Sequence, residues 1–100
     1  MNTKEFQNMI LKTTDPRLIS LQGTYRLWIP CLAEESGEVA KIFRKLENEN
    51  ISKEDREKIV EEVGDVIVTC VLIAASSGIS LEEILDNSIK KFMRRYGVEQ

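Results

Sequence analysis

EESGEVAKIF, at residues 34–43, and IVEEVGDVIVT, at residues 59–69, are the two stretches that decide the fold. In the first, apolar residues recur at the spacing of one helical face and continue beyond it (Val39, Ile42, Phe43 and Leu46). In the second, an apolar residue recurs every seven positions (Ile59, Val66 and Ile73). These patterns predict two amphipathic helices, over about residues 30–47 and 52–77, with a turn at residues 48–51 between them.

Each predicted helix carries two acidic residues beside its apolar stripe: Glu35 and Glu38 on the first, Glu62 and Asp65 on the second. If the helices form an antiparallel hairpin turning about Asn50, Glu35 lies opposite Asp65 and Glu38 opposite Glu62. Four carboxylates at one level repel one another unless a cation neutralises them. Because these are hard oxygen ligands and the chain has no histidine, the pattern predicts Mg²⁺, with Mn²⁺ as the alternative.

The remaining segments also favour helix. Residues 3–12 form a short first helix, which the run from Thr13 to Pro16 ends, and Gly23 indicates a turn. Ser52 with Asp55 is an approximate capping box for the third helix, and Ser80 with Glu83 is a clearer one that opens a last helix. No segment alternates as a strand does. We therefore expect residues 1–100 to form a single all-α domain, a four-helix-type bundle with a central antiparallel helical hairpin.

Residues 66–75 are apolar on nearly every side of their helix, and a helix of that kind is usually buried all round. Four short helices cannot easily enclose it, so we expect a homo-oligomer, either a homodimer or a homotetramer. We also expect Cys31 and Cys70, which fall in apolar stretches without a CxxC spacing, to be buried free thiols.

The composition argues against several classes of protein. Net charge is −3, which argues against a general nucleic-acid or membrane-surface binder. No apolar run approaches the roughly 20 residues that span a bilayer. No secretory signal opens the chain, so we expect a cytoplasmic protein without nucleic-acid or membrane partners.

The acidic segments resemble a known family. Residues 34–38, EESGE, followed by residues 62–65, EVGD, are similar to the EExxE…ExxD signature of the MazG-like nucleotide pyrophosphohydrolases, which belong to the all-α nucleoside triphosphate pyrophosphohydrolase superfamily. Residues 87–96, NSIKKFMRRY, resemble the family's N-x-x-K-x-x-x-R segment. The resemblance covers about residues 27–97, and residues 1–26 match nothing we can name.

The resemblance implies a Mg²⁺-dependent enzyme that cleaves the α–β phosphoanhydride of a nucleoside triphosphate into monophosphate and pyrophosphate. It implies an assembly with sites near the subunit interface. By matching position, the metal ligands are Glu35, Glu38, Glu62 and Asp65. Glu34 holds a second metal's waters or orients the attacking water, and a carboxylate such as Glu38 serves as base where histidine is missing.

Five further residues are candidates for substrate binding, and each has a structural alternative: Trp28, Lys41, Asn87, Lys90 and Arg94. Trp28 stacks on a base or belongs to the core. Lys90 and Arg94, four residues apart, hold the triphosphate or complement the helix dipole. Lys41 reaches a phosphate or forms a surface ion pair, and Asn87 bonds sugar or phosphate or is simply solvated.

Two other functions stay open. One is hydrolysis of a related phosphoanhydride, such as phosphoribosyl-ATP. The other is a non-catalytic helical module whose acids bind metal for structure or bind a basic partner. Pyrophosphate release discriminates among them, whereas nothing in the sequence identifies a preferred base, the number of metal ions or the physiological pathway.

Overall fold

The computed structural model describes residues 1–46 and 50–97. In chain order the elements are α1 (Thr3–Thr13), the 3₁₀ turn η1 (Pro16–Leu18), α2 (Leu21–Gly23), the π-helical turn η2 (Thr24–Trp28), α3 (Ile29–Arg44), α4 (Lys53–Ser76) and α5 (Leu81–Tyr96). Among the described residues there is no strand, so the predicted all-α class is confirmed.

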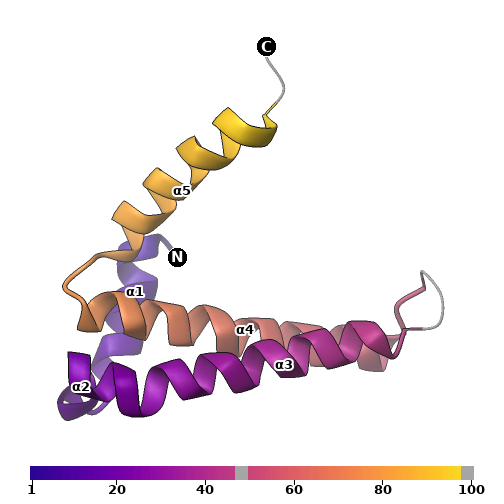
Figure 1. Cartoon of the computed structure of the whole chain (residues 1–100), viewed down its shortest axis with the longest axis horizontal. Helices are drawn as coiled ribbons and strands as arrows, with labels where there is room; N and C mark the ends of the chain where they lie inside the picture. The colour runs from indigo at the N-terminus through magenta and orange to yellow at the C-terminus, as the bar shows by residue number, and fades with distance from the viewer. Residues whose placement is uncertain (47–49, 98–100) are drawn as a thin grey trace.

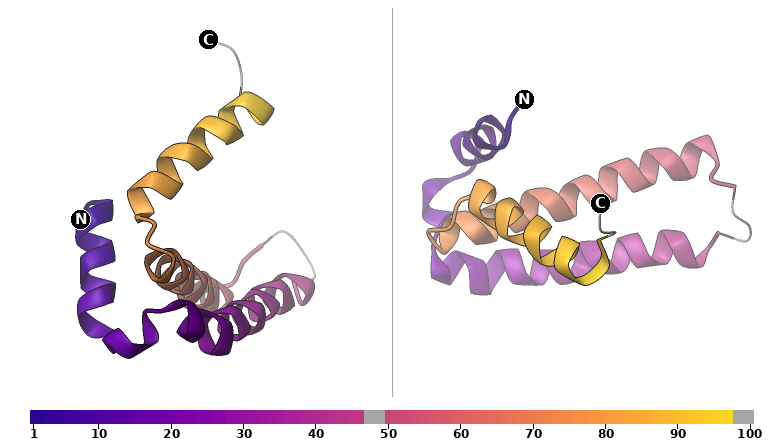
Figure 2. Two further views of the ribbon diagram at one scale, coloured as in Figure 1. Left: turned by 60° about the vertical axis from the view of Figure 1, so that its left-hand side comes forward. Right: turned by 90° about the horizontal axis from the view of Figure 1, so that it is seen from above.

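Helices α3 and α4 lie side by side along their length (Figures 1 and 2). Near one end Glu35 contacts Thr69, and near the other Lys45 and Lys58 line the same hollow. Residue numbers therefore rise along one helix as they fall along the other. The end of α3 differs from its prediction, because the helix ends at Arg44 rather than near residue 47. Residues 48 and 49 of the predicted turn at residues 48–51 lie outside the described residues.

The helical path into α3 begins earlier than the sequence suggested. Ser20 caps α2, its Oγ accepting from Gly23 N at 3.0 Å, and α2, η2 and α3 follow one another without a break. Gly23 is helical and buried, so the turn predicted there is wrong. A glycine is needed for another reason, since a Cβ at this position would overlap the backbone carbonyl of Leu18.

The core lies where α1 crosses the end of the α3–α4 pair. Its buried centre is Ile10, Val71 and Leu72, with partly buried apolar side chains packed around them (Phe6, Leu11, Trp28, Val68 and Leu81). The apolar segment at residues 66–75 supplies much of this core but is not enclosed by one chain. Ile67 is 48% exposed and Cys70 is also exposed, so the predicted burial of Cys70 is wrong for the single chain, while Cys31 is half-buried.

The starts of α4 and α5 match the capping residues read from the sequence. Ser52 accepts from Asp55 N at 3.0 Å, and Ser80 accepts from Glu83 N at 3.2 Å. Gly78, with φ +72°, ends α4 in the left-handed conformation that glycine adopts without strain. Gln7 Oε1 of α1 then accepts from Leu81 N at 2.7 Å, which ties the first turn of α5 to the core.

Beyond that first turn, α5 leads away from α3 and α4 as an arm (Figures 1 and 2). The radius of gyration is 15.9 Å, against about 13 Å for a compact domain of this length. The described helices of one chain therefore do not close into a four-helix bundle. Along the described residues no single helix is long and apolar enough to cross a bilayer; α4 and α5 meet that test together only as a pair bent by 111°.

Candidate functional site

Four acidic residues lie along the α3–α4 pair at neighbouring levels. Glu35 and Glu38 belong to α3, and Glu62 and Asp65 belong to α4. Glu35 and Glu62 are half-buried, whereas Glu38 and Asp65 are exposed. The acids therefore line a seam between the helices and are not sealed inside it, so a bound cation and a substrate can both reach them from solvent.

One contact departs from the symmetric pairing about Asn50. Thr69 Oγ1 donates to Glu35 Oε1 at 2.6 Å, so Glu35 meets Thr69, one turn beyond the Asp65 expected opposite it. Elsewhere the predicted neighbours meet, since Glu38 and Glu62 line one hollow and Val39 and Val63 line another. The two acid pairs remain neighbours, although they are not exactly level.

The electrostatics of Glu62 report how close the acids are. Burial raises the pKa of the Glu62 carboxyl above its ordinary value, and the charges of four neighbouring carboxylates raise it further, namely Asp65, Glu61, Glu38 and Glu35 in decreasing order. All three of the other predicted metal ligands thus act on Glu62. This mutual repulsion is what a divalent cation relieves.

The donor set suits a hard divalent cation, since it offers carboxylate oxygens from two facing helices. Within the described residues, however, no three acidic or thiol side chains converge closely enough to hold an ion as they stand. Glu38 and Asp65 are exposed and can change rotamer, whereas Glu35 is held by Thr69. By donor chemistry the four carboxylates suit a hard divalent cation such as Mg²⁺, although in this structure they do not converge on one point.

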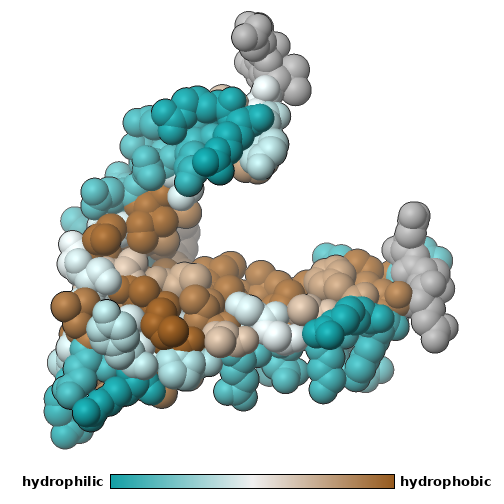
Figure 3. Space-filling model, viewed as in Figure 1, coloured by the Kyte–Doolittle hydropathy of each residue, from teal (hydrophilic) through white to brown (hydrophobic). Residues whose placement is uncertain are grey.

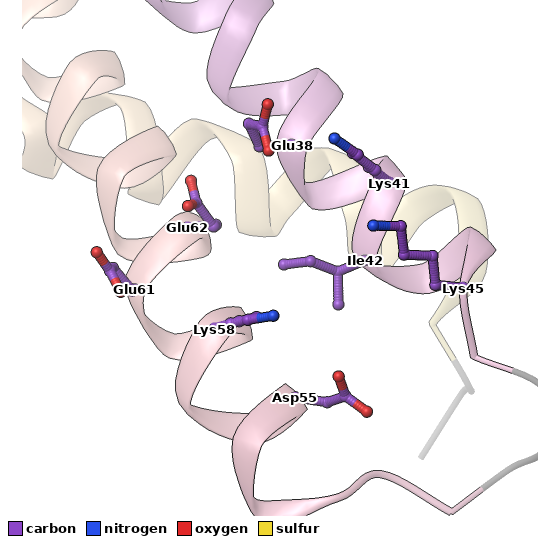
Figure 4. A pocket seen from close by; sticks show the side chains of 8 residues that line it. All are labelled: Glu38, Lys41, Ile42, Lys45, Asp55, Lys58, Glu61 and Glu62. Atoms are coloured by element: carbon purple, nitrogen blue, oxygen red, sulfur yellow. The ribbon is translucent and has the colours of Figure 1, made fainter.

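The structure brings some of the other predicted residues to this seam. Lys41 shares a hollow between α3 and α4 with Glu38 and Glu62 (Figure 4). Glu34 is exposed on α3, one turn before Glu38 and therefore on the same side of the helix.

Three predicted substrate ligands lie elsewhere in the chain. Asn87, Lys90 and Arg94 are exposed on the α5 arm, which leads away from the acids (Figure 1). Lys90 forms an ion pair with Asp86 at 3.1 Å, one turn earlier in the same helix. One chain does not bring these three residues to the carboxylates.

Trp28 has a structural role in this chain. Its indole N–H donates to the Leu18 carbonyl at 2.8 Å, and its ring packs against the buried core. This is the core alternative considered for it, and stacking on a base draws no support from these contacts.

Sequence reasoning missed Thr69 as a site residue. It is 4% exposed, and its hydroxyl is the group that orients Glu35. The available signal was a polar residue in the otherwise apolar run of residues 66–75, because a buried hydroxyl requires a hydrogen-bond partner.

The fold and the site define a class: an all-helical protein with paired carboxylates on two adjacent helices, suited to divalent metal. Comparison with known families agrees, since residues 23–97 match the model of the MazG nucleotide pyrophosphohydrolase domain. The chain therefore belongs to the MazG family, as the sequence motifs had predicted.

Two relatives from Bacillus subtilis (strain 168) are similar to this chain, and both are described as uncharacterized. YvdC is 32% identical over 73 residues, which are 65% of this chain and 69% of YvdC. YpjD is 41% identical over 66 residues, which are 64% of this chain and 60% of YpjD. No solved structure gives a significant match.

Proposed function

We propose that this protein is a Mg²⁺-dependent nucleoside triphosphate pyrophosphohydrolase. The observation that carries the proposal is the placement of four carboxylates on facing helices, close enough for three of them to raise the pKa of the fourth, Glu62. Membership of the MazG family supports the same reaction class.

In the proposed reaction, a water oxygen attacks the α-phosphorus and forms a new P–O bond. The bond from that phosphorus to the α–β bridging oxygen breaks, and its electron pair leaves with pyrophosphate. A proton passes from the water to a carboxylate base. Atoms and charge balance as nucleoside monophosphate plus pyrophosphate.

Each acid has a part in that reaction. Glu35, Glu38, Glu62 and Asp65 would hold Mg²⁺, which supplies charge neutralisation on the phosphate oxygens when bound. Thr69 fixes the orientation of Glu35. The proton from water goes to one carboxylate, either Glu34 or the oxygen of Glu38 that a metal would leave free; both residues are exposed on one side of α3, and the chain has no histidine for that task.

The test is pyrophosphate release from a panel of canonical and modified nucleoside triphosphates, with and without Mg²⁺. We expect release that requires Mg²⁺ and is lost in Glu38→Gln and Asp65→Asn. Glu57→Gln is the matched control, because Glu57 is exposed on α4 and lines a different hollow. Activity that survives either site substitution would refute the assignment.

We also propose that the protein works as a homodimer, or as a homotetramer built from such dimers. One chain exposes 8140 Å², whereas a compact monomer of 11.5 kDa exposes about 5,800 Å². The excess, about 2,300 Å², matches the area that each subunit of an obligate homodimer buries.

Part of the exposed area belongs to large apolar side chains. On the α5 arm, large apolar side chains lie on one face and are exposed (Leu85, Ile89, Phe92 and Tyr96). A hollow of about 440 Å³ at the base of the arm is lined by α1, α4 and α5, including Phe6, Ile67 and Leu85. Figure 3 shows apolar side chains along the side of α4 that faces the arm.

A second copy of the chain is the occupant we propose for this surface, and it would also bring Asn87, Lys90 and Arg94 to a neighbouring set of acids. Light scattering at micromolar concentration tests this, with an expected dimer or tetramer for the wild type and a monomer for Phe92→Glu. A monomeric wild type would overturn the proposal.

A further inference from the structure

Charge along the α5 arm is segregated into two halves. Its first half, residues 81–88, carries acidic side chains and no basic one, and its second half, residues 89–96, carries basic side chains and no acidic one. The acids are Glu82, Glu83 and Asp86, and the cations are Lys90, Lys91, Arg94 and Arg95. Two such helices bring like charges together when they lie parallel. When they lie antiparallel, the acidic half of each lies against the basic half of the other.

The helix dipole explains only part of this pattern. It acts within the first and last turns, so it accounts for the two acids at the start of α5 and the two arginines at its end. It does not account for Asp86, Lys90 and Lys91, which lie nearer the middle. In the described part of the chain, the pair of Lys90 with Asp86 at 3.1 Å is the only ion pair that the arm makes. The other charges of the arm are therefore available to a partner.

One side of the arm is an apolar stripe that becomes more exposed towards the tip. Its members follow one another at three- and four-residue spacing, which places them on one face of the helix (Leu85, Ile89, Phe92 and Tyr96). The exposed fraction rises from 46% at Leu85 to 69% at Tyr96. At the tip the rings of Phe92 and Tyr96 pack together, with centroids 5.2 Å apart. Large aromatic side chains are the usual anchors of an interface.

The base of the same arm has a hollow that can receive such an anchor. It measures about 440 Å³, lies where α5 meets α1 and α4, and is lined mainly by apolar side chains, including Met1, Phe6, Ile67, Leu81 and Leu85. Figure 3 shows apolar side chains gathered at this junction. Because Leu81 and Leu85 begin the apolar stripe, the stripe runs from the hollow at the base of the arm to the aromatic pair at its tip.

The charges and the stripe favour the same arrangement of two arms. The midpoint of α5 lies between residues 88 and 89. When two arms lie antiparallel about that point, Leu85 of one is level with Phe92 of the other, and Leu81 is level with Tyr96. The aromatic tip of each arm then lies at the hollow at the base of the other arm, while each acidic half lies against a basic half.

We infer that two copies of this chain pair their α5 arms antiparallel through the apolar stripe, with each aromatic tip docked in the hollow at the base of the other arm. The inference rests on the homodimer proposed above and deepens it, because it specifies the surface and the direction of the interface. The occupant is a second copy because α5 is complementary to itself in both charge and shape. The same surface is buried on both subunits, so the pairing closes as a dimer.

Disulfide crosslinking of the full chain tests the direction, in a background with Cys31→Ser and Cys70→Ser. Ile89→Cys, next to the midpoint, should crosslink with its own copy. Leu85→Cys alone and Phe92→Cys alone should not, because two copies of either position lie about 10 Å apart along the helix axis. A disulfide joins Cα atoms no more than about 7 Å apart. A mixture of these two variants, left to exchange subunits, should crosslink, whereas parallel arms would crosslink each variant on its own.

The charges are tested by the double variant Lys91→Glu/Arg95→Glu, which cancels the positive charge of the second half of the arm. We expect dimer affinity, measured by sedimentation, to weaken by about tenfold or more, and more at low salt than at high salt. Lys12→Glu/Arg26→Glu is the matched control, because it changes the net charge equally at exposed positions on α1 and η2. Thermal melts check that each variant folds, and Lys91→Glu alone replaces the double variant if it does not.

Three results would overturn the pairing of the arms: crosslinking of Leu85→Cys with its own copy, unchanged dimer affinity in the arm variant, or an equal loss in the control variant. The related proposals fail separately. A monomeric wild type refutes the homodimer together with the pairing, whereas a dimer that Ile89→Cys does not crosslink refutes the pairing alone. Absence of nucleotide hydrolysis refutes the proposed activity and leaves a crosslinked pair of arms standing.

Discussion

Replacing Thr69 with valine keeps the shape of the side chain and removes the hydroxyl that donates to Glu35 Oε1 at 2.6 Å. A hydrogen bond to a charged acceptor contributes about 1.5–3 kcal/mol. Glu35 is half-buried and regains part of this free energy by bonding to water, so the lower end of that range applies. Loss of an orienting partner costs a metal site about 10- to 100-fold in affinity. We therefore expect Thr69→Val to weaken Mg²⁺ binding by about tenfold.

The assay is calorimetric titration of Mg²⁺, supported by the shift in melting temperature that saturating Mg²⁺ produces. Thr69→Ser is the matched control, because it keeps the hydroxyl and loses only the methyl group, and it should retain most of the wild-type affinity. If a folded Thr69→Val variant binds Mg²⁺ as tightly as the wild type, Glu35 is not a metal ligand that depends on Thr69.

Three further predictions concern stability and are tested by thermal melts. Burial and neighbouring acids raise the pKa of Glu62 in the folded chain. Its contribution to stability is therefore fully present below about 4.3, its pKa in the unfolded chain, and is lost as the pH rises through its higher pKa in the folded chain. Glu62→Gln should therefore raise the melting temperature of the metal-free protein at pH 7 and change it less near pH 4; a lower melting temperature at pH 7 would contradict this. Gly23→Ala should destabilise by about 2 kcal/mol through overlap with the Leu18 carbonyl, whereas Gly37→Ala, in open space within a helix, should be neutral or stabilising. Ser52→Ala removes the cap of α4 and should cost about 1 kcal/mol; an unchanged melting temperature would count against that cap.

The N-capping residues predicted the starts of α4 and α5 well. Capping serines at Ser52 and Ser80 act through backbone contacts only three residues away, so the sequence contains the whole interaction. Gly23 was misread because glycine serves two purposes. It was taken for a turn, whereas the chain uses it where a backbone carbonyl approaches too closely for a side chain.

The proximity of the four acids was predicted more accurately than their detailed contacts. Helical spacing placed two acids on each helix, and the raised pKa of Glu62 is the physical counterpart of that pattern. Which side chains meet between the two helices depends on their three-dimensional packing, and a symmetry argument about the turn cannot supply it. The contact between Glu35 and Thr69, 34 residues apart, therefore came only from the structure.

The direction of α5 was beyond sequence reasoning for a similar reason. Its capping residues predicted a helix, but they do not say which surface that helix packs against. In one chain the apolar side chains of α5 stay exposed, and Lys90 and Arg94 lie on this arm rather than beside the acids.

The most direct test of the proposed activity is the identity of its products. Phosphorus-31 NMR would follow each nucleoside triphosphate in the presence of Mg²⁺, with Asp65→Asn and Glu57→Gln measured alongside the wild type. We expect monophosphate and pyrophosphate from the wild type and Glu57→Gln, and no turnover by Asp65→Asn. Release of nucleoside diphosphate and orthophosphate, or no turnover of any nucleotide by the wild type, would contradict the proposed pyrophosphohydrolase.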